Sequence, residues 1–250
     1  MIERENKGDI TILRLAHGKA SALDVELLEA LIDELERIKK SDARAVVLTG
    51  TGTIFSAGVD LFRLTQGGPA YVEQFLPLLN DGLLALFELS LPVIAAVNGH
   101  AIAGGCILAQ ACDYRVMAEG NGKIGIPELL VGVPLPPVPF EIVRFAVPQQ
   151  HLQKLAESGA TYLPEEALRH GLIDEIVPAA GLLNRAMEVA TNLGRIPPDV
   201  FAITKLQIRQ PCMDRLAAVK PELLVDIAEI WRDPETHARI KEYLARTVRK

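Results

Sequence analysis

The sequence predicts an α/β protein in which strand–helix–strand units repeat and a helical region follows. Short, continuous apolar runs, such as residues 45–48 and 92–97, are typical of parallel strands that are covered on both faces. Between these runs, apolar residues recur at helical spacing. The 250 residues are enough for one large core. We divide the chain into an α/β core over residues 1–195 and a C-terminal helical region over residues 196–250.

The N-terminal part begins with two short strands, at residues 2–5 and 10–15, that form a β-hairpin. A loop of mostly small residues follows over residues 17–23. Asp24 then suits the N-cap of a helix. One face of that helix carries the apolar residues Leu28, Leu31, Ile32, Leu35 and Ile38.

Two glycine-containing segments follow the strand at residues 45–48. Residues 49–58 match neither phosphate-binding glycine pattern, so we interpret them as a loop. The Gln-Gly-Gly-Pro sequence at residues 66–69 predicts a second, mobile loop. The helix after it, which Pro77 should kink or delimit, has the apolar positions Phe75, Leu79, Leu83 and Leu86.

Residues 91–117 are nearly all apolar or small and predict the next strand–helix–strand unit. A turn at Asn98-Gly99 ends the first strand, and a short helix begins at Gly104-Gly105 and runs to Ala111. Glycines at a helix entrance leave backbone N–H groups uncapped. Two interpretations are open: a helix packed tightly on a strand, or an anion hole.

The second half of the chain is mainly helical. Residues 124–139 are rich in proline and glycine, so they cannot be regular throughout. A last short strand is expected at residues 173–177. The predicted helices cover residues 146–157, a segment from Leu163, and residues 181–194, 198–209, 213–231 and 234 to the end.

Three segments carry residues suited to catalysis. Gly58 lies at a predicted turn into a helix, which leaves the N–H of Val59 free, and Gly104 has the same property. Two N–H groups that converge form an oxyanion hole, which stabilises negative charge on a carbonyl oxygen. Glu128 is a lone carboxylate among apolar neighbours. Either desolvation raises its pKa and makes it a proton shuttle, or it faces water at a helix start.

Several classes of function are not predicted. The net charge is −6 and no basic block is present, which disfavours nucleic-acid binding. Polar residues interrupt the longest apolar stretch, so a membrane span is not expected, and the N-terminal sequence lacks a signal-peptide pattern. The three cysteines and five histidines show no metal-ligand spacing. We therefore expect a cytoplasmic protein with no metal, membrane or nucleic-acid partner.

Four motifs in order resemble the enoyl-CoA hydratase/isomerase (crotonase) superfamily. They are FSAGVDL (55–61), PVIAAVNGHAIAGGCILAQACDYRV (92–116), IGIPELLVG (124–132) and EEALRHGLIDEIVP (165–178). The resemblance covers most of the chain. It implies the crotonase fold, with repeated ββα units and a C-terminal helical trimerisation region, and hence a homotrimer or a dimer of trimers.

The resemblance also implies an acyl-CoA thioester as substrate, with its carbonyl held by the N–H groups of Val59 and Gly104. No separate cofactor is implied, because coenzyme A is part of the substrate. Lys205, Lys241 and Arg246 are candidates for contacts with the phosphates. The other implied substrate- and CoA-binding residues are Ala20, Ser21, Ala22, Leu23, Ser56, Ala57, Gly58, Asp60, Leu61, Gly105 and Ile107.

One departure from the family pattern concerns the reaction. Family hydratases carry two glutamates; Glu128 matches one, but Ile107 occupies the position of the other. Hydration requires a pair of carboxylates that hold and activate water, whereas moving a double bond requires one base. The sequence of residues 104–116 is also more similar to the Δ3,Δ2-enoyl-CoA isomerase branch than to the hydratases. We expect Glu128 to be the catalytic residue of such an isomerase, with the acyl pocket walled by residues 66–80 and 134–139.

Two alternatives to the isomerase remain open. One is an enoyl-CoA hydratase, or another thioester-enolate reaction, that uses Glu128 alone. The other is a non-catalytic acyl-CoA-binding protein, because a shared fold does not guarantee shared chemistry.

Overall fold

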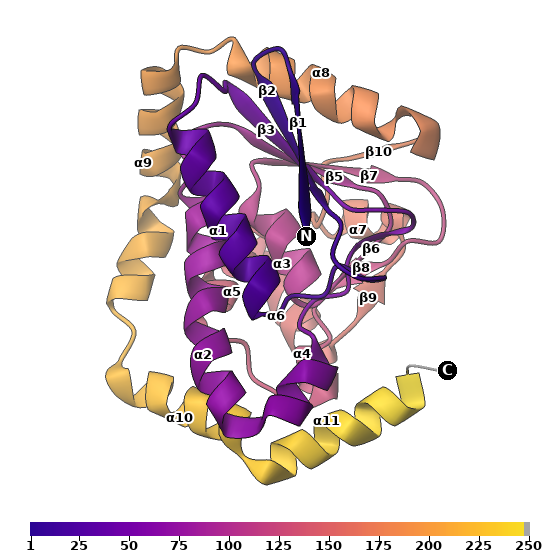
Figure 1. Cartoon of the computed structure of the whole chain (residues 1–250), viewed down its shortest axis with the longest axis vertical. Helices are drawn as coiled ribbons and strands as arrows, with labels where there is room; N and C mark the ends of the chain where they lie inside the picture. Colours follow the sequence, from indigo (N-terminus) through magenta and orange to yellow (C-terminus); the bar gives the residue numbers. More distant parts are fainter. Residues whose placement is uncertain (248–250) are drawn as a thin grey trace.

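The computed structural model describes residues 1–247 and has a large and a small β-sheet surrounded by helices (Figure 1). The strands are β1 (Ile2–Lys7), β2 (Ile10–Leu15), β3 (Ala45–Thr49), β4 (Ile54–Ser56), β5 (Val93–Val97), β6 (His100–Ile102), β7 (Tyr114–Ala118), β8 (Ile124–Gly125), β9 (Thr161–Tyr162) and β10 (Glu175–Val177). The helices are α1 (Val25–Lys39), α2 (Leu61–Phe87), α3 (Gly104–Ala111), α4 (Glu128–Val131), α5 (Pro137–Ala146), α6 (Gln149–Ser158), α7 (Pro164–Arg169), η1 (Ala179–Gly181), α8 (Leu182–Gly194), α9 (Pro198–Ala217), α10 (Pro221–Arg232) and α11 (Pro234–Thr247).

The large sheet has six strands in the order β1-β2-β3-β5-β7-β10. Only the β1–β2 pair is antiparallel; the other neighbours are parallel. Alternate side chains point to opposite faces, so Val47 and Ile94 pack with α8 while Leu48 joins the main core under α1 and α2. Figure 1 shows α8 lying across its own face of this sheet. The predicted strand at residues 45–48, covered on both faces, is therefore confirmed.

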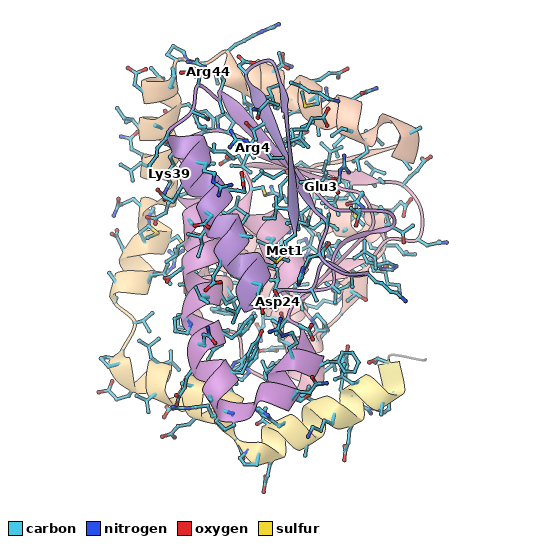
Figure 2. All side chains as sticks on the ribbon, in the orientation of Figure 1. Met1, Glu3, Arg4, Asp24, Lys39 and Arg44 are labelled. Carbon is cyan, nitrogen blue, oxygen red and sulfur yellow. The ribbon has the colours of Figure 1, made fainter. Side chains whose placement is uncertain are left out.

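Helix α1 begins where the sequence predicts. Asp24 adopts an extended conformation, and its Oδ1 accepts the N–H of Leu27 at 2.8 Å, the bonding pattern of an N-cap. His17 and Arg63 also bond Asp24, at 2.7 Å and 3.1 Å. Figure 2 labels Asp24 at the start of this helix.

The prediction of a mobile loop at residues 66–69 is wrong, because these residues lie inside α2. Gly68 leaves helical geometry, with φ 64° and ψ −155°, and Pro69 follows it. Proline disfavours helical geometry in the preceding residue, and glycine tolerates positive φ. The result is a kink within one helix. Pro77 lies further along α2 without ending it.

The small sheet was not predicted. Its order is β4-β6-β8-β9, and β4, β6 and β8 are parallel neighbours. These strands lie in segments that the sequence suggested were a loop, a turn and irregular chain. Each has only two or three residues, too few to show an alternating pattern.

The C-terminal helices wrap around one side and one end of the core (Figure 1). Helix α9 packs on α5, while α10 and α11 pack on α2. Helix α9 extends to Ala217, beyond its predicted end, and α10 begins only at Pro221. The last three positions of the helix predicted to reach the chain end lie outside the described residues.

Two polar anchors hold the start of this helical region. Arg44, labelled in Figure 2, donates to the carbonyl oxygens of Gly194 and Ile196 at 3.0–3.1 Å. Lys205 and Arg209 of α9 bond the two carboxylate oxygens of Asp113, each at 2.7 Å. Over residues 1–247, no helix is long and apolar enough to cross a membrane.

Candidate active site

The three segments that carry the predicted catalytic groups leave the same edge of the small sheet. Strand β4 leads to Gly58-Val59, β6 leads to Ala103-Gly104, and β8 leads to Pro127-Glu128. Because β4, β6 and β8 are adjacent and parallel, their carboxyl ends lie together. The small sheet thus brings all three groups into one site.

Gly58 sets how closely the first two segments approach. Its φ is +80°, a region that favours glycine. A Cβ atom at this position would lie 2.5 Å from the carbonyl oxygen of Ile102 and 2.9 Å from the nitrogen of Gly104. A side chain would therefore push the two segments apart.

The N–H groups of Val59 and Gly104, the two predicted oxyanion-hole donors, have the same hydrogen-bonding state in the structure. Neither has a hydrogen-bond acceptor among residues 1–247, whereas the neighbouring Ala103 N–H donates to Gly125 at 2.8 Å. Ala103 has φ +54° and ψ −127°, an unusual conformation for a residue other than glycine. It leaves Gly104 at the uncapped start of α3, where backbone N–H groups attract negative charge.

The Gly104-Gly105 step is a packing step, and the anion hole that the sequence also suggested stays a prediction. A Cβ atom on Gly105 would collide with the backbone oxygen of Ser56, so this glycine lets α3 pack against β4. Gly104 packs against Leu23, where a Cβ atom would lie 2.7 Å from Cδ1, yet its N–H remains unpaired within residues 1–247. Tight packing and an unpaired donor therefore occur together at this step.

Glu128 lies at the start of α4 and is only 7% exposed, so it does not face water. Its Oε2 atom has no hydrogen-bond partner among the described residues. Burial raises the pKa of this carboxyl to about 7, although a bond with its own backbone opposes the rise. A carboxyl with such a pKa can both accept and return a proton near neutral pH.

A cavity of about 70 Å³ lies between Glu128 and the oxyanion segments, lined in part by Val59 and Ala103. Trp231 of α10 and Tyr243 of α11 form its far wall. The indole of Trp231 donates to the carbonyl of Pro134 at 3.0 Å. Burial, with the nearby charge of Glu128, raises the pKa of Tyr243. The C-terminal helices therefore complete the site of their own chain.

Sequence analysis missed these two aromatic residues. Trp231 is the only tryptophan in the chain, but its position in an amphipathic helix does not indicate which cavity that helix covers. Its rarity was the only available signal.

The loop at residues 20–23 runs beside residues 57–60. Backbone bonds join Leu23 N–H to Gly58 O at 2.7 Å, Asp60 N–H to Leu23 O at 2.9 Å, and Ala57 N–H to Ala20 O at 3.0 Å. The structure therefore brings the predicted CoA-binding segments together. Their ligand contacts stay predictions.

Burial divides the residues of these CoA segments into two groups. Ser21, Leu23 and Ser56 are buried, whereas Ala57 is exposed. The Ser56 hydroxyl donates to Ser21 O at 2.7 Å and accepts the Gly58 N–H at 3.2 Å. The buried members hold the loop in place, while partly exposed Ala20, Ala22, Asp60 and Leu61 remain accessible.

Two other predicted residues lie apart from the small cavity. Ile107 is buried within α3 and is absent from the lining of every described cavity. The proposal that Lys205 meets CoA phosphates is wrong. Lys205 is buried beside Asp113, and burial lowers its pKa to about 8 despite the opposing effect of that carboxylate. Lys241 and Arg246 remain exposed.

Known proteins share both the sequence and the fold. The enoyl-CoA hydratase/isomerase family profile matches residues 5–226. Enoyl-CoA delta isomerase 1, mitochondrial, of Rattus norvegicus is 30% identical over 220 residues, 86% of this chain and 76% of that protein. A short-chain-enoyl-CoA hydratase of Clostridium acetobutylicum is 31% identical over 211 residues, 82% of this chain and 80% of that protein.

The fold is that of human mitochondrial delta3-delta2-enoyl-CoA isomerase, with a TM-score of 0.92 at 24% identity, covering 98% of this chain and 97% of that one. A probable enoyl-CoA hydratase from Mycobacterium tuberculosis gives a TM-score of 0.83 at 28% identity, covering 91% and 96%. The predicted crotonase fold is therefore confirmed. The chain belongs to the enoyl-CoA hydratase/isomerase family and is an enzyme of the enoyl-CoA isomerase or hydratase type.

Proposed function

We propose that the protein is an enoyl-CoA isomerase that converts a 3-enoyl-CoA thioester into the conjugated 2-enoyl-CoA. The observation that carries this proposal is a buried carboxyl, Glu128, that shares the small cavity with Val59 and Ala103, next to two backbone N–H groups with no acceptor among residues 1–247. Among residues 1–247, Glu128 is the only carboxylate that lines the small cavity. The similarity to the rat isomerase supports the same reaction.

The geometry suits a proton transfer through a dienolate. The thioester oxygen accepts the N–H groups of Val59 and Gly104, and Glu128 removes a proton from C2. Electrons of the broken C–H bond move toward the carbonyl, and the two N–H groups stabilise the charge that forms on its oxygen. The double bond moves to C2–C3 as Glu128 returns the proton to C4.

Hydration is the second candidate, favoured by the similarity to the Clostridium acetobutylicum hydratase. It requires a water molecule to be held and deprotonated while a proton is delivered to C2. The family resemblance implies that Ile107 stands at the position of the second hydratase glutamate, and this residue is buried. Glu128 would have to perform both tasks, so we favour isomerisation.

We also propose that the enzyme is a homotrimer. Val200, Ile203 and Leu206 follow one side of α9 and are 52–60% exposed, and exposed apolar patches mark interaction sites. Light scattering of the wild type should give a trimer or hexamer, and Ile203→Glu should reduce its mass. A monomeric wild type would contradict this.

A cytoplasmic location stays a prediction, since the rat relative is named as mitochondrial.

The reaction is tested by the absorbance of the conjugated thioester. Wild-type protein mixed with 3-enoyl-CoA should increase this absorbance, and Glu128→Gln should lower kcat by about 10²–10⁴-fold. Glu119→Gln, which changes an exposed carboxylate, is the matched control and should retain the activity. No absorbance gain with the wild type would rule out the isomerase, and faster loss of absorbance from 2-enoyl-CoA would identify a hydratase.

A further inference from the structure

A second, much larger cavity of about 800 Å³ also borders Glu128. Glu128 is the residue that lines both cavities. The large cavity is bounded by the residues after β8 and by α5, α6 and α10. Its apolar wall includes Ile126, Leu135, Phe140, Leu152, Leu223 and Ile227.

The two cavities differ in what they can hold. A space of about 70 Å³ accommodates no more than a few water-sized groups, and the bulky side chains of Trp231 and Tyr243 are part of its lining. A space of about 800 Å³ lies within the range of pockets that enclose whole small ligands. Only the larger cavity has room for a hydrocarbon chain.

The position of Glu128 indicates the direction in which the acyl chain of the substrate would extend. In the proposed reaction the thioester oxygen lies at Val59 and Gly104, and both C2 and C4 must come within reach of Glu128. Carbon atoms beyond C4 must then continue past Glu128. The large cavity begins there, because Glu128 is part of its wall.

The charged groups of the large cavity do not oppose an uncharged chain. Glu141 is buried in the wall, but its carboxylate is paired with Arg144 at 3.1 Å and Arg215 at 2.5 Å. Glu157 and Asp226 are exposed. The buried part of the cavity therefore presents mainly hydrocarbon, which favours burial of an apolar ligand.

We propose that this cavity binds the distal acyl chain, so that the preferred substrates are thioesters with chains of about eight carbons or more. This inference rests on the proposed function for the direction of the chain. It places the wall in α5, α6, α10 and the proline-rich segment. The expected contribution of residues 134–139 is retained through Pro134, Leu135 and Pro137, whereas no residue of 66–80 lines either cavity.

The wild-type test is a chain-length series of 3-enoyl-CoA thioesters with four, six, eight and ten carbons. Each methylene buried beyond C4 should raise kcat/KM by about fourfold. The ten-carbon substrate should therefore exceed the six-carbon one by on the order of a hundredfold. A flat series would overturn the proposal.

Two variants that fill the large cavity, and one matched control, test whether this cavity causes the preference for long acyl chains. Leu223→Trp on α10 and Ala156→Phe on α6 add bulk to opposite walls of the cavity. Each should lower the ten-carbon to four-carbon ratio of kcat/KM by about tenfold or more. Leu224, the next residue on α10, is 47% exposed and lines none of the described cavities. Leu224→Trp should leave the ratio as in the wild type; an equal fall would overturn the proposal.

Binding without turnover separates this inference from the proposed reaction. Calorimetry with saturated decanoyl-CoA and butyryl-CoA measures affinity whether or not the protein isomerises anything. Decanoyl-CoA has six more methylenes than butyryl-CoA, so it should bind on the order of a thousandfold more tightly, and Leu223→Trp should remove most of that difference. This result without isomerase activity would reject only the proposed function. Equal affinities for decanoyl-CoA and butyryl-CoA would reject the proposal that the large cavity binds the acyl chain.

Discussion

The two sheets of this protein have different roles: the large sheet forms the stable core, and the small sheet positions the groups of the candidate site. The four inner strands of the large sheet, β2, β3, β5 and β7, have five or six mostly buried residues, and apolar clusters pack on both faces of the sheet. The small sheet has strands of two or three residues, yet the three segments of the candidate site leave its edge. A sheet therefore needs little buried area to position reactive groups, provided that a larger core supports it.

The two sheets are also held in different ways. Strands of the large sheet present apolar side chains to α8 or to the main core. Around the small sheet, backbone approaches backbone: a Cβ atom on Gly105 would collide with Ser56, and one on Gly125 would collide with Ala160. We therefore expect substitutions in the first region to reduce stability, and substitutions in the second to reduce catalysis.

The largest expected effect on stability comes from Asp113, between β5, β7 and α9. Its carboxylate accepts the N–H of Val93 at 2.8 Å and pairs with buried Lys205 and Arg209. Asp113→Ala would leave two buried cations unpaired, which costs about 3–5 kcal/mol. Urea unfolding measures this loss. Folded enzyme should retain its kcat, and a large fall in kcat would show that this cluster also supports the site.

Gly58→Ala should have the opposite signature. An added methyl group meets Ile102 and Gly104, so it should shift the N–H groups of Val59 and Gly104 relative to each other. Loss of one oxyanion donor typically lowers kcat by about 10²–10³-fold. Steady-state kinetics with a 3-enoyl-CoA measures this fall.

The matched change in the large sheet is Leu48→Ala, which removes a fully buried side chain. It should cost about 2–5 kcal/mol of unfolding free energy while the folded enzyme keeps its kcat. If both variants lost stability and kcat in the same proportion, the division between the sheets would be wrong.

The same contrast explains which parts of the fold were predictable. The large sheet follows from local sequence, because runs such as residues 45–48 are long enough to indicate burial on both faces. Asp24 is a cap that local spacing also reveals. Strands β4, β6 and β8 were missed since a pair or triplet of residues has no measurable period. Their pairing depends on the packing of distant segments.

The candidate site was predictable in part for a similar reason. Gly58, Gly104 and Glu128 lie within recognisable motifs, so the sequence predicts their grouping without the strands that position them. Trp231 and Tyr243 reach the cavity through the folding of α10 and α11 over the core. No local pattern specifies that long-range contact.

Glu128 affects both stability and catalysis, because its carboxyl titrates near neutral pH in the folded protein. As the base, Glu128 must be ionised, so kcat/KM should fall about tenfold per pH unit below a pKa near 7. The folded state raises this pKa from 4.5 to about 7. Between these values the folded protein keeps a proton that the unfolded chain has lost, so stability falls as pH rises.

The total loss of unfolding free energy from this carboxyl amounts to roughly 3 kcal/mol. Glu128→Gln has no such titration. Its stability relative to the wild type should therefore increase between pH 5 and pH 8, as measured by urea unfolding at both values. Parallel stability curves for the two proteins would show that Glu128 titrates in the folded state as it does in the unfolded chain.

The smallest expected effect concerns Ala103, whose φ of +54° is unfavourable for alanine. Ala103→Gly relieves that strain but gives the unfolded chain more freedom, and these effects nearly offset each other. Stability should change by no more than about 1 kcal/mol. The kcat should fall by only about threefold, because Ala103 N–H still bonds Gly125 and holds Gly104 in place. A hundredfold fall would mean that the alanine itself, through its methyl group on the cavity wall, keeps the oxyanion donors aligned.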